Sequence, residues 1–187
     1  LGIKIMTKKI LTALDLLALS AICIISYLAL ILQIIDSELP CALCVMQRMG
    51  FYAISFGLIL NLCQERDTKH YMLIILAALL TSFMGLIQVL LHIVPGTGGY
   101  GDPVFGMHMY TWTFVLCMLF IFYAIIAGLL TPKTQNTQNN APIPNSIKII
   151  SGVLIISLIL NIISAFFECG PYLCPSDPQS YWLLNLL

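Results

Sequence analysis

Two cysteines and an arginine in "PCALCVMQR", residues 40–48, are the side chains best suited to chemistry. Cys41, Cys44 and Arg48 stand at i, i+3 and i+7, so on a helix they share one face. Pro40 suits a first helical turn, which predicts a helix beginning near Cys41. A helix N-terminus and a nearby cation both favour thiolate over thiol, and Cys-X-X-Cys spacing is typical of a redox dithiol. The pattern predicts electron transfer through sulfur.

A second cysteine pair, Cys169 and Cys174, lies in "FFECGPYLCPSDP", just after the last apolar stretch. Gly170 and the prolines around it favour a tight, irregular turn. We expect an exposed, strained disulfide there, and such bonds exchange readily with the thiols of another protein. The pair is therefore predicted to be a shuttle, while a static clamp on the tail remains an alternative.

Three other interpretations of the first pair compete with this one. A c-type haem site requires His directly after the second cysteine, and Val45 at that position excludes it. A zinc site made from both pairs stays open, although it gives Arg48 no role as a ligand. A structural disulfide also stays open, although closing so short a loop removes little entropy from the unfolded chain.

The composition is that of an integral membrane protein. Of the 187 residues, 60% are hydrophobic and 9% are charged, against about 25% charged residues in soluble domains. A membrane span needs about 20 mostly apolar residues, and the first such run is expected to be a retained span. A net charge of zero, without a long basic run, argues against nucleic acid as a partner. We expect one all-α membrane domain with spans at about 10–35, 49–63, 71–94, 110–130 and 149–167.

The basic residues predict the orientation, because Lys and Arg favour short loops on the cytoplasmic side. Seven of the eight fall in three segments that share one side if the N-terminus is cytoplasmic. Both cysteine pairs then lie on the outer side, where Arg48 is the sole Lys or Arg. The seven are Lys4, Lys8, Lys9, Arg66, Lys69, Lys133 and Lys148.

"PCALCVMQR" resembles the Cys-X-X-Cys-X-X-X-Arg signature that opens the second span in the DsbB family of bacterial disulfide-bond formation proteins. The resemblance implies a four-helix-bundle core in the inner membrane, a ubiquinone or menaquinone cofactor, and a periplasmic DsbA-like partner of thioredoxin fold. Carried over to this chain, it makes Cys41 and Cys44 the quinone-proximal pair and Arg48 the quinone contact.

"GLIQVLLHIVPG" is also similar to the family, with Gln88 and His92 at i and i+4. His92 is a candidate quinone ligand, and an interfacial histidine without a role is the equally weighted alternative. For His108 a surface position is expected.

The chain departs from the family after the third span. The family has four spans with its second cysteine pair in the loop between the third and fourth, whereas the loop at 95–109 contains no cysteine here. The second pair instead follows an added fifth span, after a polar inner linker at 131–148. The last residues, "QSYWLLNLL", predict a short interfacial segment within an outer tail at 168–187. Vitamin K epoxide reductase-like proteins fit less well, because their active pair lies late in the chain.

These observations predict a quinone-dependent thiol oxidase. Cys169 and Cys174 would take electrons from the periplasmic partner and pass them through Cys41 and Cys44 to quinone, in the lipid bilayer beside Arg48. The alternative is a non-catalytic membrane protein whose four outer cysteines form structural disulfides or a metal site. That alternative predicts that Arg48 is dispensable.

Overall fold

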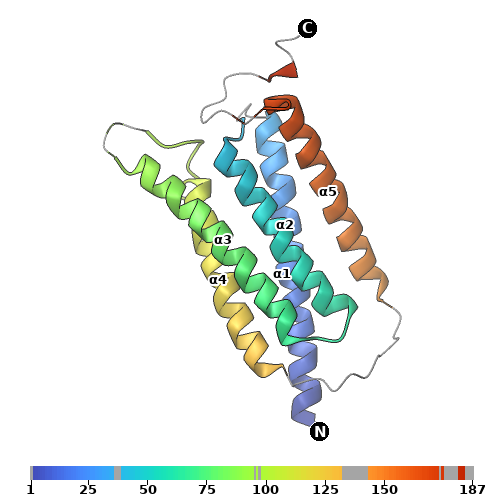
Figure 1. The fold of residues 1–187 in the computed structure, drawn as a ribbon. Coiled ribbons are helices and arrows are strands. Elements are labelled where there is room, and N and C mark those ends of the chain that lie inside the picture. Colours follow the sequence, from blue (N-terminus) through green and yellow to red (C-terminus); the bar gives the residue numbers. More distant parts are fainter. Residues whose placement is uncertain are drawn as a thin grey trace.

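The computed structural model describes residues 2–35, 39–94, 96, 98–131, 143–172, 174 and 181–183. Within these residues the chain forms helices and no strands, and an isolated β-bridge joins Val104 and Met107. The helices are long and apolar enough to cross a membrane, which confirms the predicted all-α membrane fold (Figure 1). They are α1 (Gly2–Ile35), α2 (Ala42–Cys63), α3 (Thr68–His92), α4 (Met109–Leu130) and α5 (Asn145–Cys169).

The helices extend beyond the apolar stretches of the sequence. The predicted span at 49–63 is the later part of α2, which begins at Ala42, and the predicted span at 149–167 lies within α5, which begins at Asn145. Hydropathy marks the part of a helix that suits lipid, whereas backbone hydrogen bonding continues through polar residues that find partners inside the protein. Most of the predicted inner linker, residues 132–142, lies outside the described residues.

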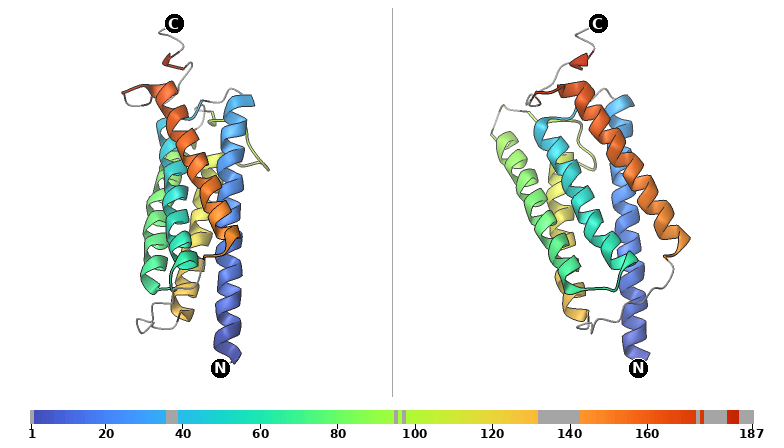
Figure 2. Two further views of the ribbon diagram at one scale, coloured as in Figure 1. Left: turned by 90° about the vertical axis from the view of Figure 1, so that its right-hand side faces the viewer. Right: turned by 45° about the vertical axis from the view of Figure 1, so that its right-hand side comes forward.

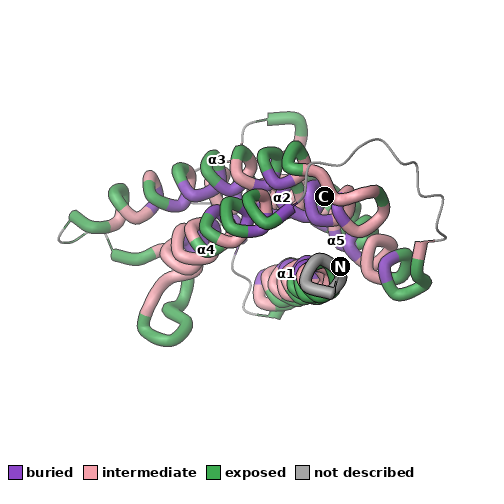
Figure 3. The backbone as a smooth tube through the Cα atoms, turned by 90° about the horizontal axis from the view of Figure 1, so that it is seen from below, coloured by how far each residue is buried: buried purple, intermediate pink, exposed green. Residues whose placement is uncertain are grey.

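α3 packs tightly against both α2 and α4, and small residues allow this close approach. A Cβ atom added at Gly50 of α2 would lie 1.9 Å from Oγ1 of Thr81 on α3. One added at Gly85 of α3 would lie 3.0 Å from the carbonyl oxygen of Tyr110 on α4. Figure 3 shows α2, α3 and α4 grouped together, with α1 and α5 beside them.

A buried polar cluster ties the helices together near the N-terminal end of α1. The Asp15 carboxylate pairs with Arg66 at 2.8 Å and accepts hydrogen bonds from the hydroxyls of Tyr71 and Tyr123. Asp15 is fully buried, so these partners offset the cost of removing its charge from water. The cluster joins α1, the α2–α3 connection, α3 and α4.

The alternating direction of the helices brings the two cysteine pairs to the same end of the protein. Cys41 directly precedes α2, and Cys169 is the last residue of α5. Figures 1 and 2 show the start of α2 and the end of α5 together, opposite the N-terminus.

Candidate redox site

Cys41 begins α2 by acting as its N-cap. Its Sγ accepts a hydrogen bond from the backbone N–H of Cys44 at 3.2 Å, a role that usually falls to an oxygen side chain. The helix therefore starts where the sequence predicts, with Pro40 just before the cap rather than in the first turn. The sulfurs of both cysteines lie at the positive end of the helix dipole, which favours negative charge.

The amide of Gln88 from α3 contacts both sulfurs. Its Nε2 lies 3.4 Å from the Sγ of Cys41 and 3.4 Å from the Sγ of Cys44. Its Oε1 accepts a hydrogen bond of 2.7 Å from Nε2 of Gln47, which turns the amide donor toward the sulfurs. Gln88 is almost fully buried, so this orientation is held by packing. The sequence pointed to Gln88 through its spacing from His92 but not through this contact.

Cys41 and Cys44 are both free thiols in this structure, and they differ in their surroundings. The hydrogen bond with the Cys44 side chain and burial raise the pKa of the Cys41 thiol well above its usual value. Cys41 is thus the thiol that keeps its proton. Negative charge at Cys44 interacts favourably with Arg48.

Arg48 is held by neutral oxygen atoms from two other helices. Its guanidinium donates to Oε1 of Gln33 on α1 at 2.7 Å and to Oδ1 of Asn161 on α5 at 3.2 Å. A further N–H donates to the carbonyl oxygen of Ala29 at 3.3 Å. Among the described residues the salt bridge joins Arg66 to Asp15, so Arg48 has no carboxylate bonded to it. Its positive charge is therefore not neutralised by a direct ion pair and can act on the cysteines and the cavity.

The fifth helix is built into the site by further polar contacts. Asn161 donates to the Tyr52 hydroxyl at 2.7 Å, and that hydroxyl is also 2.7 Å from Oγ of Ser157. Gln33 donates to Oγ of Ser164 at 2.7 Å. Sequence analysis missed these residues, although polar side chains within apolar spans were a signal that could have found them.

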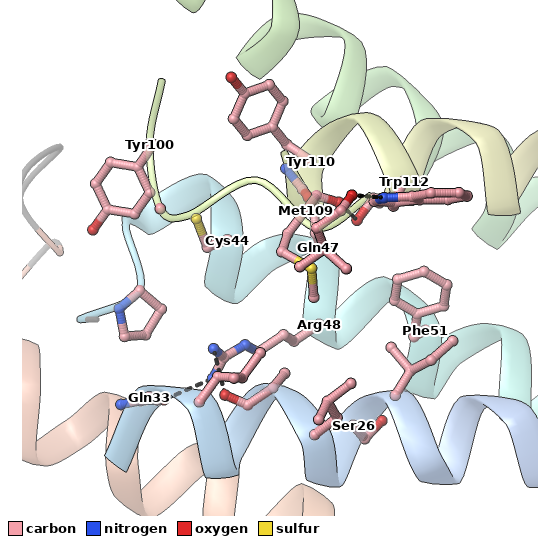
Figure 4. A pocket seen from close by; sticks show the side chains of 18 of the residues that line it. Ser26, Gln33, Cys44, Gln47, Arg48, Phe51, Tyr100, Met109, Tyr110 and Trp112 are labelled. Carbon is pink, nitrogen blue, oxygen red and sulfur yellow. Dashed lines mark hydrogen bonds between the residues drawn. The ribbon is translucent and has the colours of Figure 1, made fainter. Parts of the chain in front are cut away.

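A cavity of about 320 Å³ lies between α1, α2, α4 and the loop before α4. Arg48, Cys44 and Gln33 border it, and aromatic and aliphatic side chains form most of its wall (Figure 4). Cys41 and His92 are not among the described residues that line it. The lining is Ile25, Ser26, Leu28, Ala29, Leu32, Gln33, Leu39, Pro40, Cys44, Gln47, Arg48, Phe51, Gln88, Tyr100, Gly101, Val104, Phe105, Met109, Tyr110, Trp112, Thr113 and Leu116.

The two outer histidines stack on Tyr110, which is part of the cavity wall. The ring centroid of His92 is 5.3 Å from that of Tyr110, and the centroid of His108 is 5.2 Å from it. Nδ1 of His92 lies 2.8 Å from the carbonyl oxygen of Gln88 and donates to it, because a carbonyl can only accept. A quinone-binding role for His92 stays a prediction. His108 is half-buried against Gly99 and Tyr110 rather than a free surface histidine.

The second pair forms a disulfide, with a Cα–Cα distance of 4.8 Å. The expectation of an exposed bond just beyond the span is wrong for one partner: Cys169 is the last residue of α5 and is 6% exposed. Part of the tail folds back here, since the N–H of Trp182 donates to the carbonyl oxygen of Glu168 at 3.0 Å. Of the predicted interfacial segment at 179–187, residues 179–180 and 184–187 lie outside the described part.

Glu168 precedes Cys169 in the chain and also interacts with residues around the first cysteine pair. Its carboxyl interacts electrostatically with both Arg48 and Cys44 on α2. A four-thiolate metal site would need four free sulfurs to converge, whereas Cys169 and Cys174 are bonded to each other. Across the described ranges no cluster of three or more His, Cys, Asp or Glu side chains is arranged to hold a metal ion.

Comparison with known proteins gave one finding. Residues 12–99 match the family model described as "Disulfide bond formation protein DsbB". The match covers most of α1 together with α2 and α3, and so includes Cys41, Cys44, Arg48, Gln88 and His92. It ends before α4 and α5, as the sequence resemblance predicted. Neither the search of curated proteins nor that of solved structures gave a match.

Proposed function

Since the chain belongs to the DsbB family through residues 12–99, we propose that it is a quinone-dependent thiol oxidase of the bacterial inner membrane. It reoxidises a periplasmic DsbA-like protein of thioredoxin fold and passes the electrons to ubiquinone or menaquinone. One observation carries the proposal: Cys44 and Arg48 border the same apolar cavity, at the end of the bundle that also holds the second cysteine pair.

The cavity has the properties that a quinone headgroup requires. Its volume of about 320 Å³ is in the range of small-molecule sites. Phe51, Tyr110 and Trp112 offer flat apolar surface, while Arg48 and Gln47 offer hydrogen-bond donors for the carbonyl oxygens of the ring. A bound quinone supplies an acceptor for two electrons and two protons.

The two cysteine pairs divide the reaction between them. The partner's dithiol becomes a disulfide as the Cys169–Cys174 bond is reduced to two thiols. These thiols then exchange with a Cys41–Cys44 disulfide, which restores the outer bond and leaves Cys41 and Cys44 reduced. Cys41 and Cys44 return to the disulfide by losing two electrons and two protons.

The protein stabilises charge where the second half of the reaction needs it. Cys44 has the helix N-terminus, the Gln88 amide and the Arg48 guanidinium around it, and each favours the thiolate. Arg48 also faces the cavity, where it favours negative charge on a bound acceptor. The basic residues Arg66 and Lys69 lie at the opposite end, which supports a periplasmic position for both cysteine pairs.

The proposal is tested by anaerobic quinone reduction with purified protein. A reduced thioredoxin-fold protein and a small dithiol serve as alternative donors, and the parent is compared with Cys41→Ser, Arg48→Ala and Cys169→Ser. We expect Cys41→Ser to abolish turnover, Arg48→Ala to require more quinone, and Cys169→Ser to lose activity with the protein donor. A well-folded parent that reduces no quinone overturns the proposal and favours the non-catalytic alternative.

A further inference from the structure

Glu168 is an acidic residue enclosed by the protein at the outer end of α5. It is 3% exposed, and neither carboxyl oxygen has a hydrogen-bond partner among the described residues. Asp15, the other carboxyl buried in a helix, has Arg66 and two tyrosines as direct partners. An unpaired buried carboxylate is costly, and such groups gather at functional sites, where a change of protonation is used.

The carboxyl of Glu168 belongs to the surroundings of both cysteine pairs. Cys169 of the outer disulfide is its neighbour in the chain, and Cys44 of the inner pair interacts with it electrostatically. Arg48 interacts with it as well, without a direct ion pair. Glu168 is therefore placed where protons lost by one pair can reach the other.

Exchange between the pairs requires such a transfer. Two outer thiols and an inner disulfide become an outer disulfide and two inner thiols, so two protons leave one pair and two join the other. Cys169 and Cys41 are 6% and 5% exposed, which limits direct proton transfer to water. A protein group close to the reacting sulfurs can accept a proton from one pair and donate it to the other.

We propose that Glu168 is the proton carrier for disulfide exchange between the two cysteine pairs, an inference that rests on the proposed function. The carboxylate of Glu168 takes the proton of the Cys169 thiol as that sulfur attacks Cys41. The Cys169–Cys41 bond forms, the Cys41–Cys44 bond breaks, and Cys44 leaves with the electron pair beside Arg48. Glu168 holds this proton while Arg48 stabilises the Cys44 thiolate.

The second step closes the outer disulfide. Cys174 loses its proton to water and attacks Cys169, forming the Cys169–Cys174 bond as the Cys169–Cys41 bond breaks. Cys41, which is still next to Glu168 through its bond to Cys169, leaves with the electron pair and takes the proton that Glu168 holds. Cys44, which is half-buried, takes the other proton from water. The outer pair has then lost two electrons and two protons, and the inner pair has gained both.

The test measures exchange without quinone, so that it is independent of the later reaction. Protein with both disulfides formed is mixed with a reduced thioredoxin-fold donor, quenched in acid at successive times and alkylated. Peptide mass spectrometry then follows the appearance of thiols at Cys41 and Cys44. The measurement is repeated between about pH 5 and pH 9, the range in which perturbed carboxyl groups and thiols titrate.

The thiols of Cys169 and Cys174, formed by the donor, also titrate in this pH range, and the Glu168 variants separate their contribution from that of the carboxyl. Arg48 stays charged throughout, and Cys44 starts in a disulfide. α1, which packs against α5, contributes the uncharged Gln33 to this region. In the parent, the exchange rate is expected to fall as the pH is lowered through the ionisation of Glu168, because a protonated carboxyl cannot accept the thiol proton.

Glu168→Gln keeps the size of the side chain and removes the proton acceptor. We expect its exchange at pH 7 to be at least about tenfold slower, since general acid–base groups contribute about 10²–10⁴-fold, and the carboxyl-dependent part of the pH profile to disappear. Glu168→Asp should restore part of the rate and the pH dependence. Glu65→Gln makes the same chemical change in the connection between α2 and α3, at the opposite end, and should match the parent.

Thermal unfolding and formation of the Cys169–Cys174 disulfide establish that each variant is folded. A Glu168→Gln rate within about twofold of the parent, with the same pH profile, overturns the inference. Equal impairment of Glu168→Gln and Glu168→Asp also overturns it, because that result indicates packing. A parent that reduces quinone with a small dithiol but shows no exchange between the pairs overturns the inference and leaves quinone-dependent oxidation standing. A parent that reduces no quinone overturns the proposed function itself.

Discussion

The two cysteine pairs occupy opposite ends of their helices, and this difference gives their sulfurs different electrostatic surroundings. Cys41 and Cys44 lie at the N-terminus of α2, with a positive helix dipole, an amide donor and Arg48 nearby. Cys169 is at the C-terminus of α5, where the dipole is negative and Glu168 is adjacent. Thiolate is favoured at the first position and disfavoured at the second.

In the proposed relay, this difference favours electron flow from the outer pair to the inner pair. Stabilising the thiolate of a pair stabilises its reduced form, which makes its disulfide the stronger oxidant. The Cys41–Cys44 disulfide should therefore oxidise the outer pair.

Removal of one sulfur from each pair should give the largest contrast. Cys44→Ser is expected to reduce quinone turnover to background with every donor, because the thiolate beside Arg48 is lost. Cys174→Ser should lose turnover with the protein donor and keep turnover with a small dithiol that reaches the inner pair. Steady-state quinone reduction with both donors measures this, and equal loss in the two variants would contradict the division of roles.

Arg48→Gln should have the next largest effect. Losing a charge-assisted contact of about 1.5–3 kcal/mol corresponds to about a 10- to 150-fold rise in the quinone concentration for half-maximal rate. Arg48→Lys keeps the charge but loses the forked donor that reaches Gln33 and Asn161, so it should recover only part of this loss. Titration of quinone at saturating dithiol provides the values.

Gly170→Ala tests the outer pair alone. Gly170 has φ of +64°, and a Cβ there would lie 2.6 Å from the Trp182 ring. The strain of about 1–3 kcal/mol should loosen the tail and speed reduction of the Cys169–Cys174 bond by dithiothreitol about tenfold. Gly152→Ala, also on α5, has open space around its Cβ and serves as the matched control. An unchanged rate in Gly170→Ala would show that tail packing does not protect the disulfide.

Gln88→Leu should give the smallest effect, and it tests the redox equilibrium of the inner pair alone. It removes a donor to both sulfurs, worth about 1 kcal/mol or about a fivefold change in the equilibrium between dithiol and disulfide. The reduced form loses stabilisation, so the disulfide becomes a weaker oxidant. Equilibration with glutathione buffers measures the shift. Gln64→Leu at the other end of α2 is the control, and a Gln88→Leu disulfide that becomes more oxidising would exclude the assigned role.

The sequence predicts the arrangement of the first pair but not the burial of the second. Cys41, Cys44 and Arg48 lie within one helical segment, so their spacing predicts a shared face. The burial of Cys169 depends on a tail that returns to α5 through Trp182, a contact between residues without any periodic pattern. Composition therefore indicated an exposed bond where the fold encloses one of its sulfurs.

By itself, the sequence determined the all-α membrane fold, the common end for both pairs and the shared helical face of Cys41, Cys44 and Arg48, because hydropathy, alternation of direction and helical spacing can be read along the chain. Only the tertiary structure decided the partners of the motif. Gln88 on the sulfurs, Gln33 and Asn161 on Arg48, and Glu168 near Cys44 come from helices far apart in the chain. Which faces of these helices meet is determined by packing between them, and similar apolar sequences can pack in several ways.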